Sequence, residues 1–487
     1  MSIPVRAFVA MMLMVSWVRP ASSQLSSWEA ENEAGHQAFL QGHYVEAQNH
    51  FLAAIISAKQ MGDDDPHNVT ALNNLAALYM REGRYADAEQ LYLQALSIRK
   101  DISGTEDRES ATIHSNLGAL YYKQGRYFDA ESLYKSALDI RAKLHVPEDA
   151  QEGSILSNLG VLYYVQGKYS PAEALFQSAL AIQAKAPGAE PIDQATLLNN
   201  LGMIYREQGK YSDAENAFEG AVAFLEKSAE SQNPETATIL CNWASLFKSE
   251  GKYSRAEPLF TRALAMREKL LGPNHPDVAA SLNYLAVLYL LQGKYSKVQP
   301  LAQRALAIRE QSLGRENMGV AEILNTLGSL YKKRHEYLKA EQSYQRASEI
   351  LTKAFGSDNP SAARALLNLG SLYVEEGKLA QAEPLLKTSL DSMQKSLGPV
   401  HPDVALADAT LATLYLKQNG YEEAESYCQD ALDILGKSSM PQYPALIEVL
   451  DTYASLLSKT NRRAQAELFE TRVMTYKAEF REINGGK

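Results

Sequence analysis

One eight-residue stretch decides the fold: QGKYSDAE, at Gln208–Glu215. Near-copies of it are QGKYSPAE at Gln166–Glu173, EGKYSRAE at Glu250–Glu257 and QGKYSKVQ at Gln292–Gln299. Weaker copies extend the series in both directions, and the second position of the octet is then Gly42, Gly83, Gly125, Gly167, Gly209, Gly251, Gly293, His335, Gly377, Asn419 and Asn461. The spacing between these positions is 41 once and 42 every time after that. A fixed period over most of a chain indicates a repeat protein.

Each copy of the octet lies between two runs that have helical periodicity. Before the octet, Leu, a small residue and Tyr recur in register, as in Leu75, Ala76 and Tyr79. The small residue would let a neighbouring helix approach closely. After the octet, an alanine recurs at a fixed offset, as Ala95, Ala137, Ala179, Ala221, Ala263, Ala305, Ala347 and Ala431. Both patterns are typical of packing positions, so each period predicts a helix, a tight turn and a second helix.

The octet also predicts how the turn is made. A glycine just past the end of a helix takes the left-handed conformation that other residues resist. We expect the same conformation at the three positions where another residue replaces it: His335, Asn419 and Asn461. Ser254 precedes Glu257 by three residues, the spacing of a capping box that opens a helix. Ser170 repeats the pattern and adds Pro171, expected at the first helical position.

These patterns predict an all-α solenoid of about eleven helix–turn–helix repeats. We expect residues 24–66 to form a first, capping hairpin, residues 67–442 to form nine repeats of 42 residues, and residues 443–487 to form a C-terminal capping hairpin. In such a stack each unit contacts only its neighbours. Cys241 and Cys428 lie four units apart and are therefore expected to be free thiols.

The N-terminal residues 1–23 have the pattern of an export signal. Arg6 is followed by the apolar run Ala7–Val18, and the small residues Ala21 and Ser23 suit cleavage after Ser23. We expect an extracytoplasmic protein, periplasmic or secreted; the alternative is that this segment is a buried first helix. The apolar run is too short for a stable membrane span. The net charge of −10 argues against a nucleic-acid partner, which would need clustered Lys and Arg.

The repeats resemble tetratricopeptide repeats, and their period of 42 resembles that of kinesin light chains and related bacterial arrays. The resemblance rests on the segment Arg267–Glu310, which includes LGPNHPDVA, and on LGPVHPDVA at Leu397–Ala405, and it extends over about residues 26 to 480. It implies a right-handed superhelix whose first helices line a concave groove for extended peptides. No heptad coiled coil precedes the repeats, so only the binding mode is carried over.

In that family, asparagines just before the packing leucine bind the peptide backbone. The matching positions are Asn74, Asn116, Asn158, Asn200, Asn242 and Asn368, with Asn199 beside the fourth. An amide carries both a donor and acceptors, so it suits backbone recognition. The alternative is that these asparagines brace neighbouring helices. Near the helix ends the same stripe is expected to carry the cations Arg81, Lys123, Arg206 and Lys248, with Tyr122 and Tyr164 beside them, which together could select acidic partners. The alternative for each of these charges is a solvated helix face.

The seventh repeat departs from this pattern. Tyr284 takes the place of the ladder asparagine, and the same helical stripe contains Ala280, Asn283, Val287, Leu290 and Leu291. Apolar groups at groove positions indicate a pocket for a hydrophobic anchor of the partner. The alternative is that the superhelix curls enough for another repeat to cover them.

The sequence has no pattern of catalysis, so we expect neither an enzyme nor a cofactor. His275 and His401 sit in the HPD motif, where they are interpreted as capping or turn residues. His36, His43 and His50 fall on helix, turn and helix and do not form a metal site. The prediction is an exported scaffold that binds peptides or proteins in the concave groove. The alternatives are an assembly component of the cell envelope, self-associating, or an accessory subunit of a complex.

Overall fold

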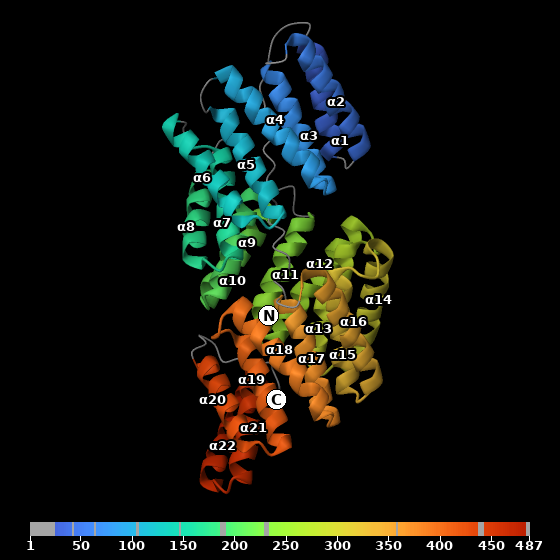
Figure 1. The fold of residues 1–487 in the computed structure, drawn as a ribbon, viewed down its shortest axis with the longest axis vertical. Helices are drawn as coiled ribbons and strands as arrows, with labels where there is room; N and C mark the ends of the chain where they lie inside the picture. The colour runs from blue at the N-terminus through green and yellow to red at the C-terminus, as the bar shows by residue number, and fades with distance from the viewer. Residues whose placement is uncertain are drawn as a thin grey trace. The chain divides into compact units, whose positions relative to one another are not determined.

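The chain is an all-α repeat protein in the computed structural model (Figure 1). The structure describes residues 25–40, 43–62, 65–103, 107–145, 148–185, 191–227, 233–356, 359–436 and 443–483. Within these ranges there are 22 helices and no β-strand. Residues 1–23, expected to be an export signal, lie outside the described residues. None of the described helices is long and apolar enough to cross a membrane.

Consecutive helices of the described ranges pair into ten hairpins, in which an odd-numbered first helix packs against an even-numbered second helix. The pairs are α1 (Leu25–Leu40) with α2 (Tyr44–Met61), α3 (Pro66–Glu82) with α4 (Tyr85–Ser103), α5 (Arg108–Lys123) with α6 (Tyr127–Lys143), α7 (Ala150–Val165) with α8 (Tyr169–Gln183), α11 (Pro234–Ser249) with α12 (Tyr253–Leu271), α13 (Pro276–Leu291) with α14 (Tyr295–Leu313), α15 (Met318–Lys333) with α16 (Tyr337–Phe355), α17 (Pro360–Glu376) with α18 (Leu379–Leu397), α19 (Pro402–Gln418) with α20 (Tyr421–Gly436), and α21 (Tyr443–Lys459) with α22 (Arg463–Ile483). Between α8 and α11 the chain forms α9 (Pro191–Glu207) and α10 (Tyr211–Lys227), the two helices of the fifth repeat. The predicted all-α solenoid of about eleven repeats is confirmed.

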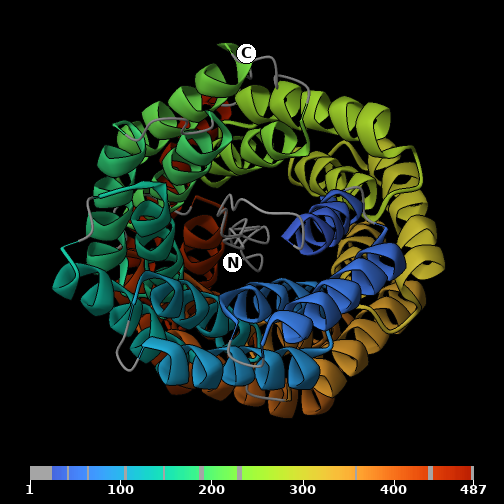
Figure 2. The ribbon, with the colours of Figure 1, turned by 90° about the horizontal axis from the view of Figure 1, so that it is seen from above.

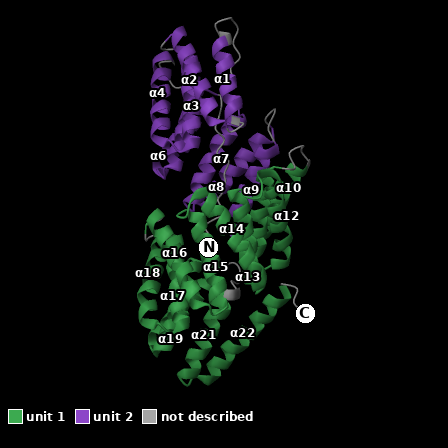
Figure 3. Ribbon diagram, turned by 90° about the vertical axis from the view of Figure 1, so that its right-hand side faces the viewer, with its two compact units in different colours: residues 1–7, 209–487 green, residues 8–208 purple. Residues whose placement is uncertain are grey.

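The chain divides into two compact units (Figure 3). Among the described residues, unit 2 contains α1–α9 and unit 1 contains α10–α22. Within each unit successive hairpins stack on one another. In unit 1 the hairpins follow chain order along a curved row, which is visible from above (Figure 2).

The packing predicted for the small residue of the first helix is observed. A methyl group added to Gly118 would lie 3.0 Å from the ring of Tyr134, and one added to Gly160 would lie 3.0 Å from the ring of Phe176. Both aromatic rings come from the second helix of the same repeat and are fully buried. In these two hairpins the glycine therefore makes room for the aromatic side chain, and the pair forms part of the core.

The turns have the predicted left-handed residue. Gly83, for example, has φ of 80°. Its N–H donates to the Met80 carbonyl, and this hydrogen bond closes the end of α3. His335, Asn419 and Asn461 have φ of 58°, 64° and 60°, so they hold the same conformation without being glycine.

The predicted capping boxes are wrong. The second helices begin at the tyrosine of the octet, so Ser170 and Ser254 lie inside α8 and α12. The residues before these helices, Lys168 and Lys252, make no capping hydrogen bond through their side chains. Pro171 is the third helical residue rather than the first, where its missing N–H still costs nothing because the first four N–H groups of a helix have no partner within it.

The interpretation of the two HPD histidines is confirmed. His275 Nδ1 accepts a hydrogen bond from the Asp277 amide at 3.1 Å, and His401 Nδ1 does the same with Asp403 at 3.1 Å. Pro276 and Pro402 open the helices that follow. The histidines therefore cap first helices, a task that Asp65, Asn233, Asn317 and Asn359 perform in other repeats.

Candidate functional site

The asparagine ladder is buried in the structure. Its members Asn74, Asn116, Asn158, Asn199, Asn200 and Asn242 are between 1% and 5% exposed. The amides connect consecutive first helices: Asn74 donates to Asn32 at 2.9 Å, Asn116 donates to Asn73 at 2.9 Å, and Asn368 donates to Asn325 at 3.3 Å.

This geometry matches the alternative in which the asparagines brace neighbouring helices. A first helix packs against the first helices of the next repeats as well as against its own second helix. The stripe that periodicity assigns to an open groove is therefore covered. A peptide could reach these amides only after the first helices separate, and backbone recognition by the ladder stays a prediction.

The four cations do not lie on one stripe. Arg81 and Lys123 occupy the last-turn position of α3 and α5, and both are exposed. Arg206 and Lys248 fall one position earlier in the repeat and are half-buried. Arg206 Nη2 lies 2.6 Å from Glu207 Oε1, with only 14% of its side chain exposed. Of the four predicted cations, only Arg81 and Lys123 are exposed at equivalent positions of consecutive repeats.

Tyr122 and Tyr164 occupy the position of Arg206 in the two repeats before it, and both are half-buried. Each packs against the first tyrosine of its own second helix, Tyr127 or Tyr169, with 5.8 Å between ring centroids. Burial raises the pKa of Tyr122 to about 12 and that of Tyr164 further. These rings stabilise the hairpin turn and have little surface for a ligand.

The two residues predicted to form an apolar pocket in the seventh repeat have different surroundings. Tyr284 stacks on Phe260 with 5.6 Å between centroids, so it belongs to the packing. Leu291 is 45% exposed and lines a hollow of about 360 Å³. The other lining residues are Tyr253, Ser254, Glu257, Gln292, Lys294, Phe480 and Arg481. Phe480 and Arg481 come from α22, so the last repeat does partly cover this position.

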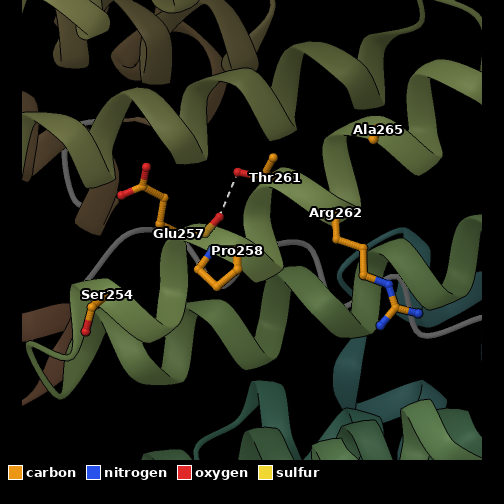
Figure 4. Close-up of a pocket in the computed structure, with 6 residues that line it drawn as sticks. All are labelled: Ser254, Glu257, Pro258, Thr261, Arg262 and Ala265. Atoms are coloured by element: carbon orange, nitrogen blue, oxygen red, sulfur yellow. Dashed lines mark hydrogen bonds between the residues drawn. The ribbon is translucent and has the colours of Figure 1, made fainter.

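A second hollow, of about 670 Å³, lies along α12 beside the first (Figure 4). Ser254, Glu257, Pro258, Thr261, Arg262 and Ala265 line it. Pro258 lacks an N–H, so the carbonyl of Ser254 has no helical donor. Thr261 Oγ1 donates to the Glu257 carbonyl at 2.8 Å. This hollow is wide open to solvent, and its lining exposes more apolar than polar surface.

Sequence reasoning missed a series of contacts made by the glutamate that ends the octet. Glu257 Oε1 accepts a hydrogen bond from the Tyr289 hydroxyl of the next repeat at 2.9 Å, and its other oxygen lies 3.2 Å from Lys294 Nζ. The same 32-residue Tyr-to-Glu bond joins Tyr121 to Glu89, Tyr163 to Glu131, Tyr373 to Glu341 and Tyr415 to Glu383. The recurrence of both residues in the 42-residue register was the signal that could have revealed them.

Cys241 and Cys428 are buried, free thiols, as expected, and burial raises the pKa of Cys428 to about 12. Within the described ranges no three His, Cys, Asp or Glu side chains are grouped as metal ligands would be. His50 Nδ1 lies 2.7 Å from Glu31, which ties α2 to α1.

The chain belongs to the tetratricopeptide repeat family. The family model matches residues 29–101, 109–185, 154–227, 193–269, 235–311, 319–395, 369–435 and 403–478. The predicted resemblance to tetratricopeptide repeats is thereby confirmed. None of the curated proteins compared with the chain matches its sequence.

Three solved structures illustrate the likeness. BtubC (BKLC) from P. vanneervenii is 26% identical, with 48% of this chain and 92% of that chain covered and a TM-score of 0.41. A kinesin light chain from Podosopora anserina with nearly identical TPR-like repeats is 24% identical, with 41% and 94% covered and a TM-score of 0.36. A Rap protein in complex with Competence and Sporulation Factor is 16% identical, with 78% and 100% covered and a TM-score of 0.52, a likeness of fold alone.

Proposed function

We propose that the chain is an exported scaffold that binds acidic peptide segments of other proteins on the first-helix side of its repeats. Residues 1–23 support export through their charged, apolar and small-residue pattern. The family supports a protein partner, because tetratricopeptide repeats build interaction surfaces from stacked hairpins.

The observation that carries the binding proposal is the exposed pair Arg81 and Lys123 at the ends of α3 and α5. Packed helices lie about 8–10 Å apart, a distance that about three residues of extended peptide span. Two cations at this spacing can engage two acidic side chains of one peptide. The rest of the chain carries an excess of acidic groups, so these two cations direct an acidic peptide to this part of the surface.

A peptide library titrated against the mature chain tests the proposal. We expect peptides with two acidic residues three or four apart to bind, and we expect the double variant Arg81→Glu/Lys123→Glu to lose them. Lys100→Glu is the matched control, because Lys100 is exposed on α4, the second helix of Arg81's repeat. Equal binding by the double variant and the wild type would overturn the proposal.

One observation favours the alternative of self-assembly. Three apolar residues on one face of α2 are exposed: Val45 at 76%, Leu52 at 38% and Ile56 at 61%. Leu93 on α4 holds the position equivalent to Leu52 and is also exposed. Light scattering as a function of concentration tests this alternative: dimers that Ile56→Glu abolishes would establish it, and a concentration-independent monomer would exclude it.

A further inference from the structure

The last helix contacts a repeat that is not its neighbour. The Phe480 ring of α22 lies edge-on to the Tyr253 ring at the start of α12, with 5.8 Å between centroids and 84° between the planes. These helices belong to the eleventh and sixth repeats, whereas stacked repeats ordinarily contact only the next ones. Both are in unit 1, whose curved row brings its end back beside its beginning (Figure 2).

The burial at the sixth turn is a consequence of this contact. Gly251 is buried, while the equivalent turn glycines Gly83, Gly125, Gly167, Gly293 and Gly377 are exposed. A methyl group added to Gly251 would lie 3.0 Å from the Phe480 ring. Tyr253 is 5% exposed. The other described tyrosines that open a second helix are half-buried or exposed. The ring of Phe480 therefore occupies a site made by the backbone of Gly251 and the side chain of Tyr253.

The end of α22 contributes no buried side chain to the core of its hairpin, and its Lys477 pairs with Asp451 of α21 at 3.0 Å. Ala466 and Val473 are its buried residues within 463–483, and every residue from Met474 to Ile483 is exposed or half-buried. The hollow of about 360 Å³ remains open between Phe480, Leu291 and Lys294. Phe480 thus fills only part of an apolar site, and the helix end that carries it can leave without opening the core of its own hairpin.

We propose that the sixth turn is a docking site for an aromatic side chain at the end of a partner's amphipathic helix, and that Phe480 occupies this site in cis until such a helix displaces it. The proposal rests on the proposed function, because it adds a second contact of the same scaffold. Gly251 lets a ring approach the backbone, Tyr253 offers an edge-to-face partner, and Leu291 offers an apolar wall. Lys294 and Glu257 pair with each other at 3.2 Å, so their charges offset each other beside the ring, and Arg481 adds one positive charge to the lining.

The first experiment measures occupancy by Phe480 and needs no partner. Hydrogen exchange of the turn between α11 and α12 is compared in the full chain and in Phe480→Ala. We expect faster exchange at residues 250–256 in the variant, because the ring no longer covers Gly251. Leu468→Ala is the matched control, since Leu468 is an exposed apolar residue of the same helix outside the hollow. Unchanged exchange in Phe480→Ala would overturn the proposal.

The second experiment measures the site as a receptor. The probe is a synthetic peptide with the sequence of residues 466–483, titrated against the full chain and against full-length Phe480→Ala. We expect the variant to bind on the order of ten-fold more tightly, because a site that its own Phe480 occupies about nine-tenths of the time weakens apparent affinity by that factor. The peptide carrying Phe480→Ala should not bind. Equal affinities of the two proteins, or binding of the altered peptide, would contradict displacement.

Failure of this inference differs from failure of the proposed function. Loss of acidic-peptide binding in Arg81→Glu/Lys123→Glu would persist if Phe480 proved irrelevant, because those cations lie in unit 2 and the docking site lies in unit 1. Conversely, restored protection at residues 250–256 on addition of the probe peptide would support the site even if no acidic peptide bound. Dimers of the wild type that Phe480→Ala abolishes would overturn occupancy in cis.

Discussion

At the scale of a residue, His335 occupies a backbone conformation that its own side chain disfavours. It holds a left-handed turn with φ of 58°, a conformation that costs a residue with a Cβ atom about 1–2 kcal/mol. Its side chain is 72% exposed and lies 2.7 Å from the Tyr337 hydroxyl. An exposed contact of this kind offsets little of the backbone strain.

We therefore expect His335→Gly to raise the free energy of unfolding by roughly 0.5–1 kcal/mol, because relief of strain exceeds the entropy that glycine adds to the unfolded chain. Urea denaturation measures the change. His335→Ala separates the two contributions, since it removes the contact to Tyr337 and keeps the strain. A loss of stability in His335→Gly would mean that the side-chain contact dominates.

Asp408 is a buried carboxyl at a position where most other repeats have leucine. The equivalent residues are Leu72, Leu156, Leu198, Leu240, Leu282, Leu324 and Leu366. Burial, together with the nearby charge of Asp430, raises the pKa of Asp408 to about 7. A carboxyl with a raised pKa stabilises the fold fully below its unfolded pKa of about 3.9, and this stability is lost as the pH rises toward 7.

We expect Asp408→Leu to stabilise the protein at pH 8 by up to about 4 kcal/mol, the equivalent of a shift of about three pKa units. The gain should shrink as the pH falls toward 4, where Asp408 is protonated in both states. Thermal melts across this pH range measure both effects. Asp430→Asn should weaken the pH dependence without adding an apolar group. A gain that is independent of pH would show that packing alone is responsible.

At the scale of an element, the bond between Tyr289 and Glu257 joins α13 to the second helix of the preceding repeat. Burial alone would raise the pKa of Glu257, but the hydrogen bonds from Tyr289 and Lys294 outweigh it, so the pKa is lowered. A lowered carboxyl pKa means that the stabilisation is present above the unfolded pKa of about 4.3 and is lost as the pH falls.

We expect Tyr289→Phe to lower the free energy of unfolding by about 1 kcal/mol at pH 7, the usual worth of a hydrogen bond to a partly exposed charged group. The loss should fade below pH 4. The chain provides a matched control in Tyr331→Phe, because Gln299 replaces the glutamate at that repeat and pairs with Arg334 instead. Equal losses in the two variants at pH 7 would rule out the glutamate as the cause.

The glutamates were assigned to capping boxes because their three-residue spacing from a serine fits a local motif. In the structure the second helix starts at the tyrosine before that serine, so the serine does not cap it. The glutamate instead accepts a hydrogen bond from a tyrosine that lies 32 residues later in the chain. His275 and His401 were assigned correctly because capping depends on the adjacent backbone alone. Local chemistry is readable from one helix end, whereas a bond between repeats requires knowledge of which helix faces which.

At the scale of the whole molecule, a stack transmits a local defect mainly to its neighbours. Phe176 is a fully buried residue of α8 in a core shared by the fourth and fifth repeats. We expect Phe176→Ala to destabilise that region by about 3–5 kcal/mol, the cost of emptying a buried aromatic site. Hydrogen exchange should quicken in α7–α9 and stay unchanged in α15–α20. A uniform increase over both units would mean that the chain unfolds as one cooperative body.

The period of 42, the left-handed turn residues, the glycine-to-aromatic packing and the free thiols could all be predicted from the sequence. Each depends on contacts within one hairpin or between adjacent hairpins, and those repeat with the residues themselves. The candidate site was less predictable: Asn74, Asn116 and the rest of the ladder were placed on a polar stripe, but helical periodicity does not say whether the stripe meets water or the next helix.

Only the tertiary structure decided that these amides connect first helices and that the octet's glutamates bind tyrosines of the next repeat. It also decided that Phe480 meets Tyr253 five repeats away. That contact depends on the small rotation between consecutive hairpins, summed over five repeats. The packing of many side chains sets this rotation, so no sequence motif at Phe480 or Tyr253 indicates that the two residues meet.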